Sequence, residues 1–384
     1  YSLAESFGRT SPLHFWAAVL VAAMAVGVIG FVVEILVLRR IYKAPELFQL
    51  LATFGVVLVI KDVVLAIWGP EDLLGPRAPG LRGAVSILGH SFPEYDLVLI
   101  AIGPLVLGLL WLLLNKTRWG VLVRAATQDR DMVAALGVNQ AWLFTGVFAL
   151  GAALAGLGGA LQVPREPAQL FLDITTISDA FVVVVVGGLG SIPGAFLAAL
   201  LIAEIKALCI GIGDVHLGGT VISFSKLTLV VEFIVMAVVL VVRPWGLLGR
   251  PGGEPRHTVA TEPPARPLHG NLRLAAAGVG AVLLALPIFT EGYTLVLLID
   301  VFVFALFAAS LHFLMGPGGM VSFGHAAYFG LGAYGAGLLV LRAGLPMEAT
   351  LLLGPLVALL GGLVFGWFVV RLSGVYLAML TLAF

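Results

Sequence analysis

Charged residues and cysteine are both scarce in this 384-residue chain. Only 11% of its residues are charged, whereas 60% are hydrophobic, and the mean hydropathy is +1.10. A soluble domain carries about 25% charged residues, so a water-soluble core could not hide this much apolar surface. The single cysteine, Cys209, excludes an intrachain disulfide and a cysteine-rich zinc site. The composition therefore predicts an integral membrane protein.

The chain also lacks net charge and the motifs of common enzymes. Its 21 basic residues balance 21 acidic ones, which argues against a nucleic-acid partner. The sequence contains no G-x-x-x-x-G-K-[ST] phosphate loop, no H-E-x-x-H motif and no evident Ser/His/Asp set. We therefore expect no catalytic residues, no metal site and no ATP hydrolysis by this chain itself.

Nine apolar stretches approach the length of about 20 residues that a helix needs to cross a bilayer. They are residues 13–37, 47–69, 97–114, 141–162, 227–242, 272–289, 293–315, 319–342 and 349–371. A further apolar stretch, 180–210, is interrupted by Gly187-Gly188-Leu189-Gly190-Ser191-Ile192-Pro193-Gly194. Its glycines and proline predict two half-helices around a bend, forming a re-entrant hairpin. The expected fold is an all-α integral membrane protein.

Basic residues favour cytoplasmic loops and so predict the orientation of the spans. Arg39 and Arg40 follow the first span, and a further group of arginines lies between the third and the fourth. Both loops are therefore placed inside, the loop after residue 162 outside, and Arg243 inside. A re-entrant hairpin at 180–210 preserves this alternation. Residues 70–96 are expected to form an irregular outside loop because they contain prolines.

Residues 250–271 are rich in proline and glycine, which is typical of a linker. This cytoplasmic linker would separate an N-terminal part, residues 1–249, from a C-terminal part, residues 272–384. A faint repeat relates residues 31–34 to residues 368–371 and is consistent with two homologous bundles. Because the chain starts without methionine and stops inside an apolar run, we expect a piece of a longer polypeptide.

Residues 118–139 are too polar to span a membrane. At helical spacing Arg124, Gln128 and Asp131 form a polar stripe, while a more apolar set occupies another face of the helix. Gly137 is suited to end this helix. The residues alone leave two interpretations open, a helix that lies on lipid headgroups and a helix that docks a cytoplasmic partner.

Four segments together resemble the branched-chain amino-acid permease family of ABC importers. Residues 118–139 are similar to its coupling loop and residues 187–195 to its late glycine-rich break. Residues 243–249 resemble the closing motif of its first subunit type, and residues 315–334 the early signature of its second type. The resemblance implies a fusion of the two permease subunit types of the Leu/Ile/Val importer, truncated at both ends, with two homologous permease bundles in series.

The resemblance implies a permease of the bacterial inner membrane that carries branched-chain or related amino acids. Two separate ATP-binding subunits and an extracytoplasmic amino-acid-binding protein would be its partners, besides the lipid bilayer. The chain itself would bind no cofactor, because ATP and Mg²⁺ would be used by the partner subunits. The residues expected to couple it to those subunits are Arg118, Arg124, Ala125, Asp129, Ala134 and Gly137.

Irregular backbone and ionisable side chains at membrane depth are candidates for a substrate pathway. The candidates are Gly187, Gly188, Gly190, Ser191, Ser322, Phe323, Gly324 and His325. A purely structural bend at 187–194, and a histidine satisfied by a neighbouring carbonyl at position 325, remain open alternatives. Asp179 is expected to cap the half-helix that follows it rather than to bind substrate.

Lys61 and Asp62 lie within the second span and are adjacent, so they cannot pair across one helical turn. Structural pairing of Lys61 is favoured over a role in transport, with candidate partners Glu34, Glu204, Glu232 and Asp300. The alternative function is an ion-coupled secondary transporter of small polar solutes, in which such charges carry the coupling. A pore or a structural membrane protein is a third class.

Overall fold

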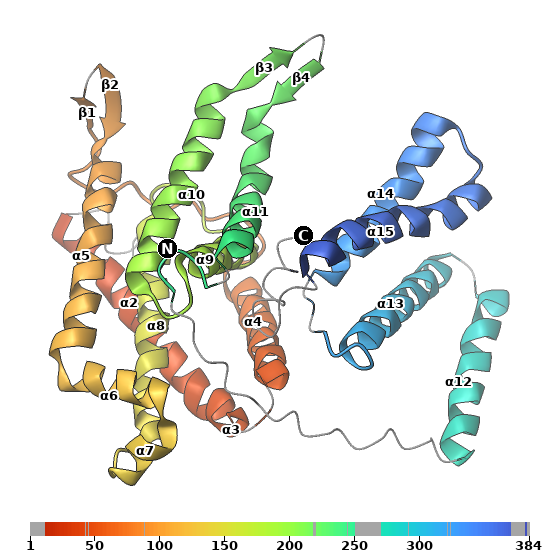
Figure 1. Ribbon diagram of the computed structural model, residues 1–384, viewed down its shortest axis with the longest axis horizontal. Helices are drawn as coiled ribbons and strands as arrows, with labels where there is room; N and C mark the ends of the chain where they lie inside the picture. The colour runs from red at the N-terminus through yellow and green to blue at the C-terminus, as the bar shows by residue number, and fades with distance from the viewer. Residues whose placement is uncertain are drawn as a thin grey trace. The chain divides into compact units, whose positions relative to one another are not determined.

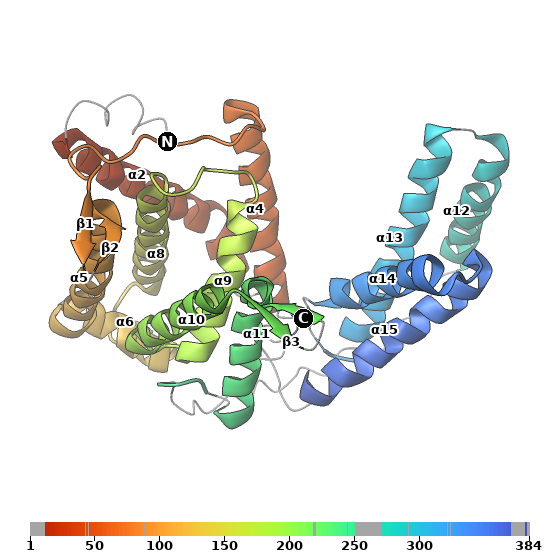
Figure 2. The same cartoon turned by 90° about the horizontal axis from the view of Figure 1, so that it is seen from above.

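The computed structural model describes residues 12–42, 44, 46–87, 89–217, 220–243, 245–249, 270–290, 292–320, 322, 324–369 and 381. The chain divides into two compact units, Tyr1–Ile177 and Ser178–Phe384. Most of the predicted linker, residues 250–269, lies outside the described residues, as do residues 370–371 of the faint repeat. Figures 1 and 2 show the helices from two directions.

Helices form most of the described chain, as expected for an all-α membrane protein (Figure 1). The first unit contains α2 (Pro12–Val33), the π-helix η1 (Glu34–Leu38), α3 (Arg39–Ile41), α4 (Glu46–Trp68), α5 (Glu94–Lys116), α6 (Arg118–Gln128), α7 (Arg130–Ala135) and α8 (Gln140–Gln162). Helix α9 (Leu172–Gly187) contains the boundary between the units. The second unit continues with α10 (Ile192–Ile212), α11 (Phe224–Val242), α12 (Gly270–Phe289), α13 (Tyr293–Met315), α14 (His325–Ala343) and α15 (Met347–Val369).

Within the described chain, eight helical segments are long and apolar enough to cross a membrane. Seven of them correspond to predicted spans, and the predicted spans 47–69 and 227–242 are also helical, as α4 and α11. The remaining segment is α10, for which the sequence predicts only half of a re-entrant hairpin. The chain is therefore a multi-pass membrane protein, and α10 is a full-length helix where the sequence predicts a half-helix.

The expected pair of half-helices at 180–210 is wrong in its second half. The glycine turn comes early in the stretch, so α10 keeps 21 residues, a length of about 32 Å, which matches a bilayer core. Helix α9, in contrast, has 16 residues. If α9 and α10 both cross the membrane, the predicted sidedness of the other loops stays the same. Two crossings return the chain to the side where it started, as a re-entrant hairpin would.

Two β-hairpins lie in loops that the sequence assigns to the outside. β1 (Ala84–Ile87) pairs antiparallel with β2 (His90–Pro93), and β3 (Asp214–Leu217) pairs with β4 (Thr220–Ser223). In each case the second strand runs directly into a helix, α5 or α11 (Figure 1). The expectation of an irregular loop at 70–96 is therefore wrong for its second half, because alternating cross-strand pairing orders that segment.

Contacts within the first unit agree with the predicted sidedness. Two backbone hydrogen bonds of 2.9 Å join Leu73 to Ala168, so the loops after α4 and α8 lie at the same end of the unit. At the other end the ring of Tyr42, after α3, lies 6.2 Å from that of Phe144, near the start of α8. Helices α6 and α7 also lie at the end of α5 that is opposite the β1–β2 hairpin (Figure 1).

Small residues allow the closest helix contacts, as is usual in membranes. Helix α2 packs along α8, where a Cβ atom on Gly30 would overlap the side chain of Ala152 (Figure 2). Helix α14 packs on α15, where a Cβ on Gly335 would stand 2.8 Å from Val357. These glycines therefore set the separation of the helix pairs.

Candidate functional site

The loop between α5 and α8 forms two short helices rather than the one predicted. Helix α6 ends at Gln128, and α7 starts at Arg130. The residue between them, Asp129, has an extended backbone, and its Oδ1 accepts a hydrogen bond of 2.9 Å from the backbone N–H of Met132. Aspartate competes with helix continuation by capping the next helix. The predicted single polar stripe over 118–139 is therefore interrupted at Asp129.

The other predicted coupling residues all lie on this helix pair. Arg118 is the first residue of α6, which is capped by Thr117, and Ala125 lies in the middle of the same helix. The exposed Arg124 contacts the side chain of Asn115 at the end of α5. Gly137, with φ of +81°, lies just after α7, in a conformation that favours glycine. Ala134 lies in the last turn of α7 and is exposed.

The helix pair has its own small core and an unusual apolar exterior. Ala126 and Val133 are buried against Leu143 at the start of α8. On the outside, Val121, Met132 and Leu136 are 51%, 60% and 75% exposed. Large apolar side chains that are exposed on a polar helical loop are available for contact with a protein or with lipid headgroups. We call Val121, Met132 and Leu136 the apolar loop patch.

A chain of contacts leads from this loop to α2. The guanidinium of Arg130, at the start of α7, lies 4.6 Å from the centre of the Phe144 ring. Phe144 packs edge-on against Tyr42, and the Tyr42 hydroxyl donates a hydrogen bond of 2.9 Å to Glu34. Burial, together with this bond to Glu34, raises the pKa of Tyr42 to about 12. Side chains in direct contact therefore connect α7 to η1, which continues α2.

Glu34 is the end point of this chain and is completely buried in the π-helix η1. Its carboxylate lies 3.6 Å from the guanidinium of Arg39 and 2.6 Å from the hydroxyl of Thr145 on α8. π-Helical turns often mark functional positions. The sequence identifies Glu34 only as a candidate partner of Lys61. That pairing is wrong, because helix rotation turns Glu34 towards α8.

The glycine-rich break at Gly187–Ser191 packs against the segment that follows α11. The backbone N–H groups of Leu247 and Leu248 donate hydrogen bonds of 2.8 and 3.1 Å to the carbonyls of Val186 and Gly187. A Cβ atom on Gly188, whose φ is +99°, would collide with the backbone of Gly249. The closing motif is therefore seated on the glycine turn, at the end of α11 that the sequence places inside.

The remaining residues of the break start the next helix. The Ser191 Oγ accepts a hydrogen bond of 3.1 Å from the backbone N–H of Gly194, and so caps α10. Gly190 also has a positive φ, of +83°, but a Cβ there would meet open space. Ser191 thus orders the turn, and Gly190 leaves it accessible.

The second group of pathway candidates lies at the start of α14. His325 Nε2 is 2.6 Å from the hydroxyl of Ser310 on α13, so its partner is a hydroxyl rather than a carbonyl. His325 Nδ1 and the buried Ser322 Oγ have no hydrogen-bond partner in the described residues. Gly324 approaches the carbonyl of Thr381 too closely for any side chain. Phe323 lies outside the described residues.

These two groups remain separate. Among the described residues, no hydrogen bond or ion pair joins the Gly187–Ser191 turn to Ser322, Gly324 or His325. A third polar group in the second unit involves residues that the sequence treats differently. Lys206 of α10 lies 2.6 Å from Glu232 of α11 and 3.6 Å from Asp179 of α9.

This ion-pair cluster corrects two expectations. Asp179 lies inside α9, so it does not cap a half-helix and instead reaches across to Lys206. Glu232 is the partner of Lys206, while Lys61 lies 3.8 Å from the centre of the Phe171 ring. Pairing across helices depends on their rotation, which the sequence pattern does not fix.

Long apolar helices, a buried polar network and an exposed polar helix pair together define a multi-pass membrane protein. The chain belongs to the family described as branched-chain amino acid transport system / permease component, which matches residues 2–240 and 293–384. It is therefore a transport permease component and not an enzyme. The unmatched residues between the two stretches include the predicted linker.

Individual relatives are similar over part of the chain. The permease protein BraD of the high-affinity branched-chain amino acid transport system of Pseudomonas aeruginosa is 28% identical over 250 residues, covering 63% of this chain and 77% of the relative. The corresponding permease LivH of Escherichia coli is 27% identical over 248 residues, covering 61% and 76%. The fructose import permease FrcC of Rhizobium meliloti is 28% identical over 122 residues, covering 30% and 33%. No solved structure matches the chain.

Proposed function

We propose that this chain is the permease of an ABC importer that carries branched-chain or related amino acids across the cytoplasmic (inner) membrane. Two separate ATP-binding subunits would supply the energy, using ATP and Mg²⁺, and this chain would bind no cofactor. An extracytoplasmic binding protein would deliver the amino acid. The observation that carries the proposal is the exposed helix pair α6–α7 with its apolar loop patch, which offers a partner a contact surface beside charged residues.

In this proposal the ATP-binding subunit binds to α6 and α7. Arg118, Arg124 and Asp129 offer charge and hydrogen bonds, and the loop patch offers apolar contact. When the subunits close on ATP, α7 would move and push on Phe144 through Arg130. The buried hydrogen bonds around Glu34 would pass that displacement to α2 and α8, which would rock and expose the path to one side at a time.

The proposed substrate pathway uses the two polar groups of the second unit. Gly187, Gly188, Gly190, Ser191 and Gly324 would contribute backbone groups, and Ser322 and His325 would contribute polar side chains. Phe323 belongs to the second set by its sequence position. The support for the second set is that Ser322 Oγ and His325 Nδ1 lack partners among the described residues. Buried polar atoms without partners are costly unless a ligand or water satisfies them.

We further propose that the two permease subunit types are fused in this chain, with the division at 250–271. The family match in two stretches, 2–240 and 293–384, supports this arrangement.

The test is co-purification of the full-length protein with its ATP-binding subunits, followed by measurement of ATPase activity and amino-acid uptake in proteoliposomes. Met132→Ser/Leu136→Ser is expected to abolish subunit binding, because it removes the apolar contact and leaves the Asp129 cap intact. Leu13→Ser, on an apolar side chain that is 81% exposed at the far end of α2, is the matched control. Uptake driven by a proton or sodium gradient without ATP would overturn the proposal.

A further inference from the structure

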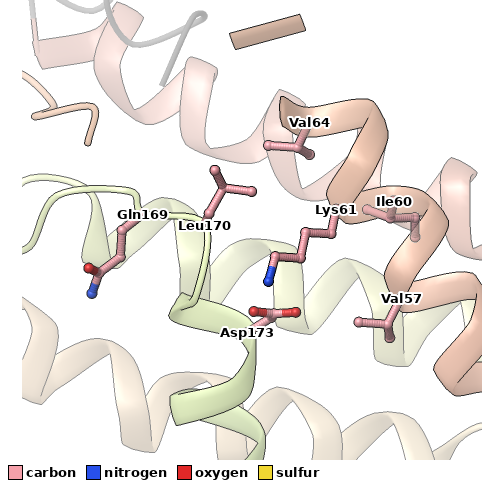
Figure 3. A pocket seen from close by; sticks show the side chains of 7 residues that line it. All are labelled: Val57, Ile60, Lys61, Val64, Gln169, Leu170 and Asp173. Atoms are coloured by element: carbon pink, nitrogen blue, oxygen red, sulfur yellow. The ribbon is translucent and has the colours of Figure 1, made fainter. Parts of the chain in front are cut away.

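A cavity of about 270 Å³ opens in the first unit between α4 and the segment that leads into α9 (Figure 3). One wall consists of Val57, Ile60 and Val64 on α4, and Leu170 faces them from the other side. Pockets for drug-sized ligands have volumes of about 300–1,000 Å³, so this cavity suits a smaller molecule. Its walls are mostly apolar.

Two opposite charges and the amide of Gln169 complete the lining. Lys61 extends from α4 into the cavity, and its amino group points towards the carboxylate of Asp173, in the first turn of α9 (Figure 3). Among the described residues, neither side chain forms an ion pair. The amino group of Lys61 lies 3.8 Å from the centre of the Phe171 ring. An ammonium and a carboxylate therefore face one small apolar space, and neither charge is neutralised by an ion pair.

The far wall is held in place by backbone contacts. The two hydrogen bonds between Leu73 and Ala168 fix the chain immediately before Leu170 to the loop that follows α4. Arg165, in the same segment, forms an ion pair of 3.1 Å with Asp96 of α5. The cavity thus lies between anchored elements, and its two charged residues come from different helices.

The cavity also lies on the side from which substrate would arrive. Lys61 is seven residues before the end of α4, a distance of about 10 Å along the helix. That end continues into the loop that meets Ala168, and both loops are on the side assigned to the outside. A solute released there would reach Lys61 before it reached the middle of the membrane.

We propose that this cavity is an entry site for a zwitterionic amino acid with an apolar side chain. Lys61 would bind the α-carboxylate, Asp173 would bind the α-ammonium, and Val57, Ile60, Val64 and Leu170 would surround the side chain. Two opposed charges beside an apolar wall match the three parts of such a molecule, whereas a sugar or an inorganic ion would match only one. The inference rests on the proposed function and names a binding site for it.

The first experiment uses the wild-type full-length protein, purified with its ATP-binding subunits but without a binding protein, which would select its own ligand. Direct binding of radiolabelled L-leucine is competed with L-leucinamide, which lacks the carboxylate, and with 4-methyl-2-oxopentanoate, which lacks the ammonium. Each analogue is expected to bind roughly 10- to 100-fold more weakly, as expected when one charge-assisted contact is lost. Equal affinity of leucine and both analogues would overturn the site.

The second experiment assigns each charge to its residue. Lys61→Met should weaken leucine binding to the level of leucinamide and leave leucinamide binding unchanged. Asp173→Asn should do the same for the oxo acid. Asp62→Asn, next to Lys61 but outside the cavity lining, is the matched control and should bind leucine normally. Size-exclusion profiles identify folded variants, and the analogue series on the wild type tests the site if a variant does not fold.

The charge exchange Lys61→Asp/Asp173→Lys separates a ligand site from a structural ion pair. A structural pair would recover its function on exchange, whereas a site that orients a zwitterion against an apolar wall would not. Recovery of leucine binding, or unchanged leucine affinity in Lys61→Met, would overturn the site while ATP-driven leucine uptake by the wild type kept the proposed function. Absence of ATP-driven amino-acid uptake by the wild type would instead refute the proposed function.

Discussion

Lys61 of α4 and Lys206 of α10 have opposite surroundings. Lys206, in the second unit, lies within 3.6 Å of both Asp179 and Glu232, and Glu232 is almost completely buried. Lys61, in the first unit, lies over an aromatic ring beside an open cavity. A lysine whose charge is balanced by two carboxylates holds three helices together. A lysine with an unused charge is available to a ligand, so position in a span does not by itself reveal the role of a charge.

The largest expected effect is on Lys206. Lys206→Met leaves the carboxylate of Glu232 buried without its partner, which typically costs about 3–5 kcal/mol of stability. The double variant Lys206→Met/Glu232→Leu should recover most of this loss, because no uncompensated charge remains near α11. Thermal unfolding of the detergent-purified protein measures both changes. A single variant as stable as the wild type would show that the ion pair does not clamp the helices.

The next effect concerns the glycine turn between α9 and α10. Gly188→Ala should destabilise the protein by more than about 2 kcal/mol, because the positive φ alone costs about 1–2 kcal/mol and the new Cβ would also collide with the Gly249 backbone. Gly190→Ala is the matched control, since it has a similar φ but open space around it. Proteolysis after residue 242, together with unfolding curves, reports the release of the closing motif. Equal effects of the two variants would contradict a seated closing segment.

A smaller effect is expected at Lys61. Lys61→Met should change stability by less than about 1 kcal/mol, since only the contact with the Phe171 ring is lost. The same unfolding measurement, run beside Lys206→Met, compares the two lysines directly. A loss as large as that of Lys206→Met would mean that Lys61 is structural and that the contrast between the units is false.

The smallest effect concerns Tyr42, which links Glu34 to Phe144 and so to the α6–α7 loop. The pKa of Tyr42 is raised to about 12, so its stabilising bond is fully present below the ordinary tyrosine pKa of 10.0 and is lost as the pH rises through about 12. Tyr42→Phe should remove this part of the alkaline loss of stability and leave stability near pH 7 only slightly lower. Unfolding curves between neutral and alkaline pH measure it. Identical pH profiles for both proteins would contradict the link.

The positions of the helices could be predicted from the sequence because each apolar stretch matches the thickness of a bilayer. The predicted spans are helical, and residues 118–139 form a polar, helical loop as their pattern indicates. The break between α6 and α7 could not be predicted, because an aspartate at position 129 is compatible both with continuing a helix and with capping a new one. The full length of α10 was not predicted, because the glycines just before its start suggested a break within the apolar stretch.

The candidate site residues were predictable only as separate motifs. The sequence identifies the glycine break and the closing motif individually, but their mutual packing depends on how α9 and α11 return to the same end of the second unit. Likewise, nothing in the sequence near Glu34 points to Thr145, which lies more than a hundred positions further along the chain. Long-range contacts of this kind depend on helix rotation and separation, which single-chain periodicity does not specify.

By itself, the sequence determined that this protein resides in a membrane and where its helices lie, and it predicted which loop faces the cytoplasm. It does so because apolar length and the distribution of arginines act locally along the chain. Only the tertiary structure decided which charges are paired, which glycines touch other backbone and which lysine faces an open cavity. Those properties belong to the surfaces between helices, and a surface exists only after the helices have packed.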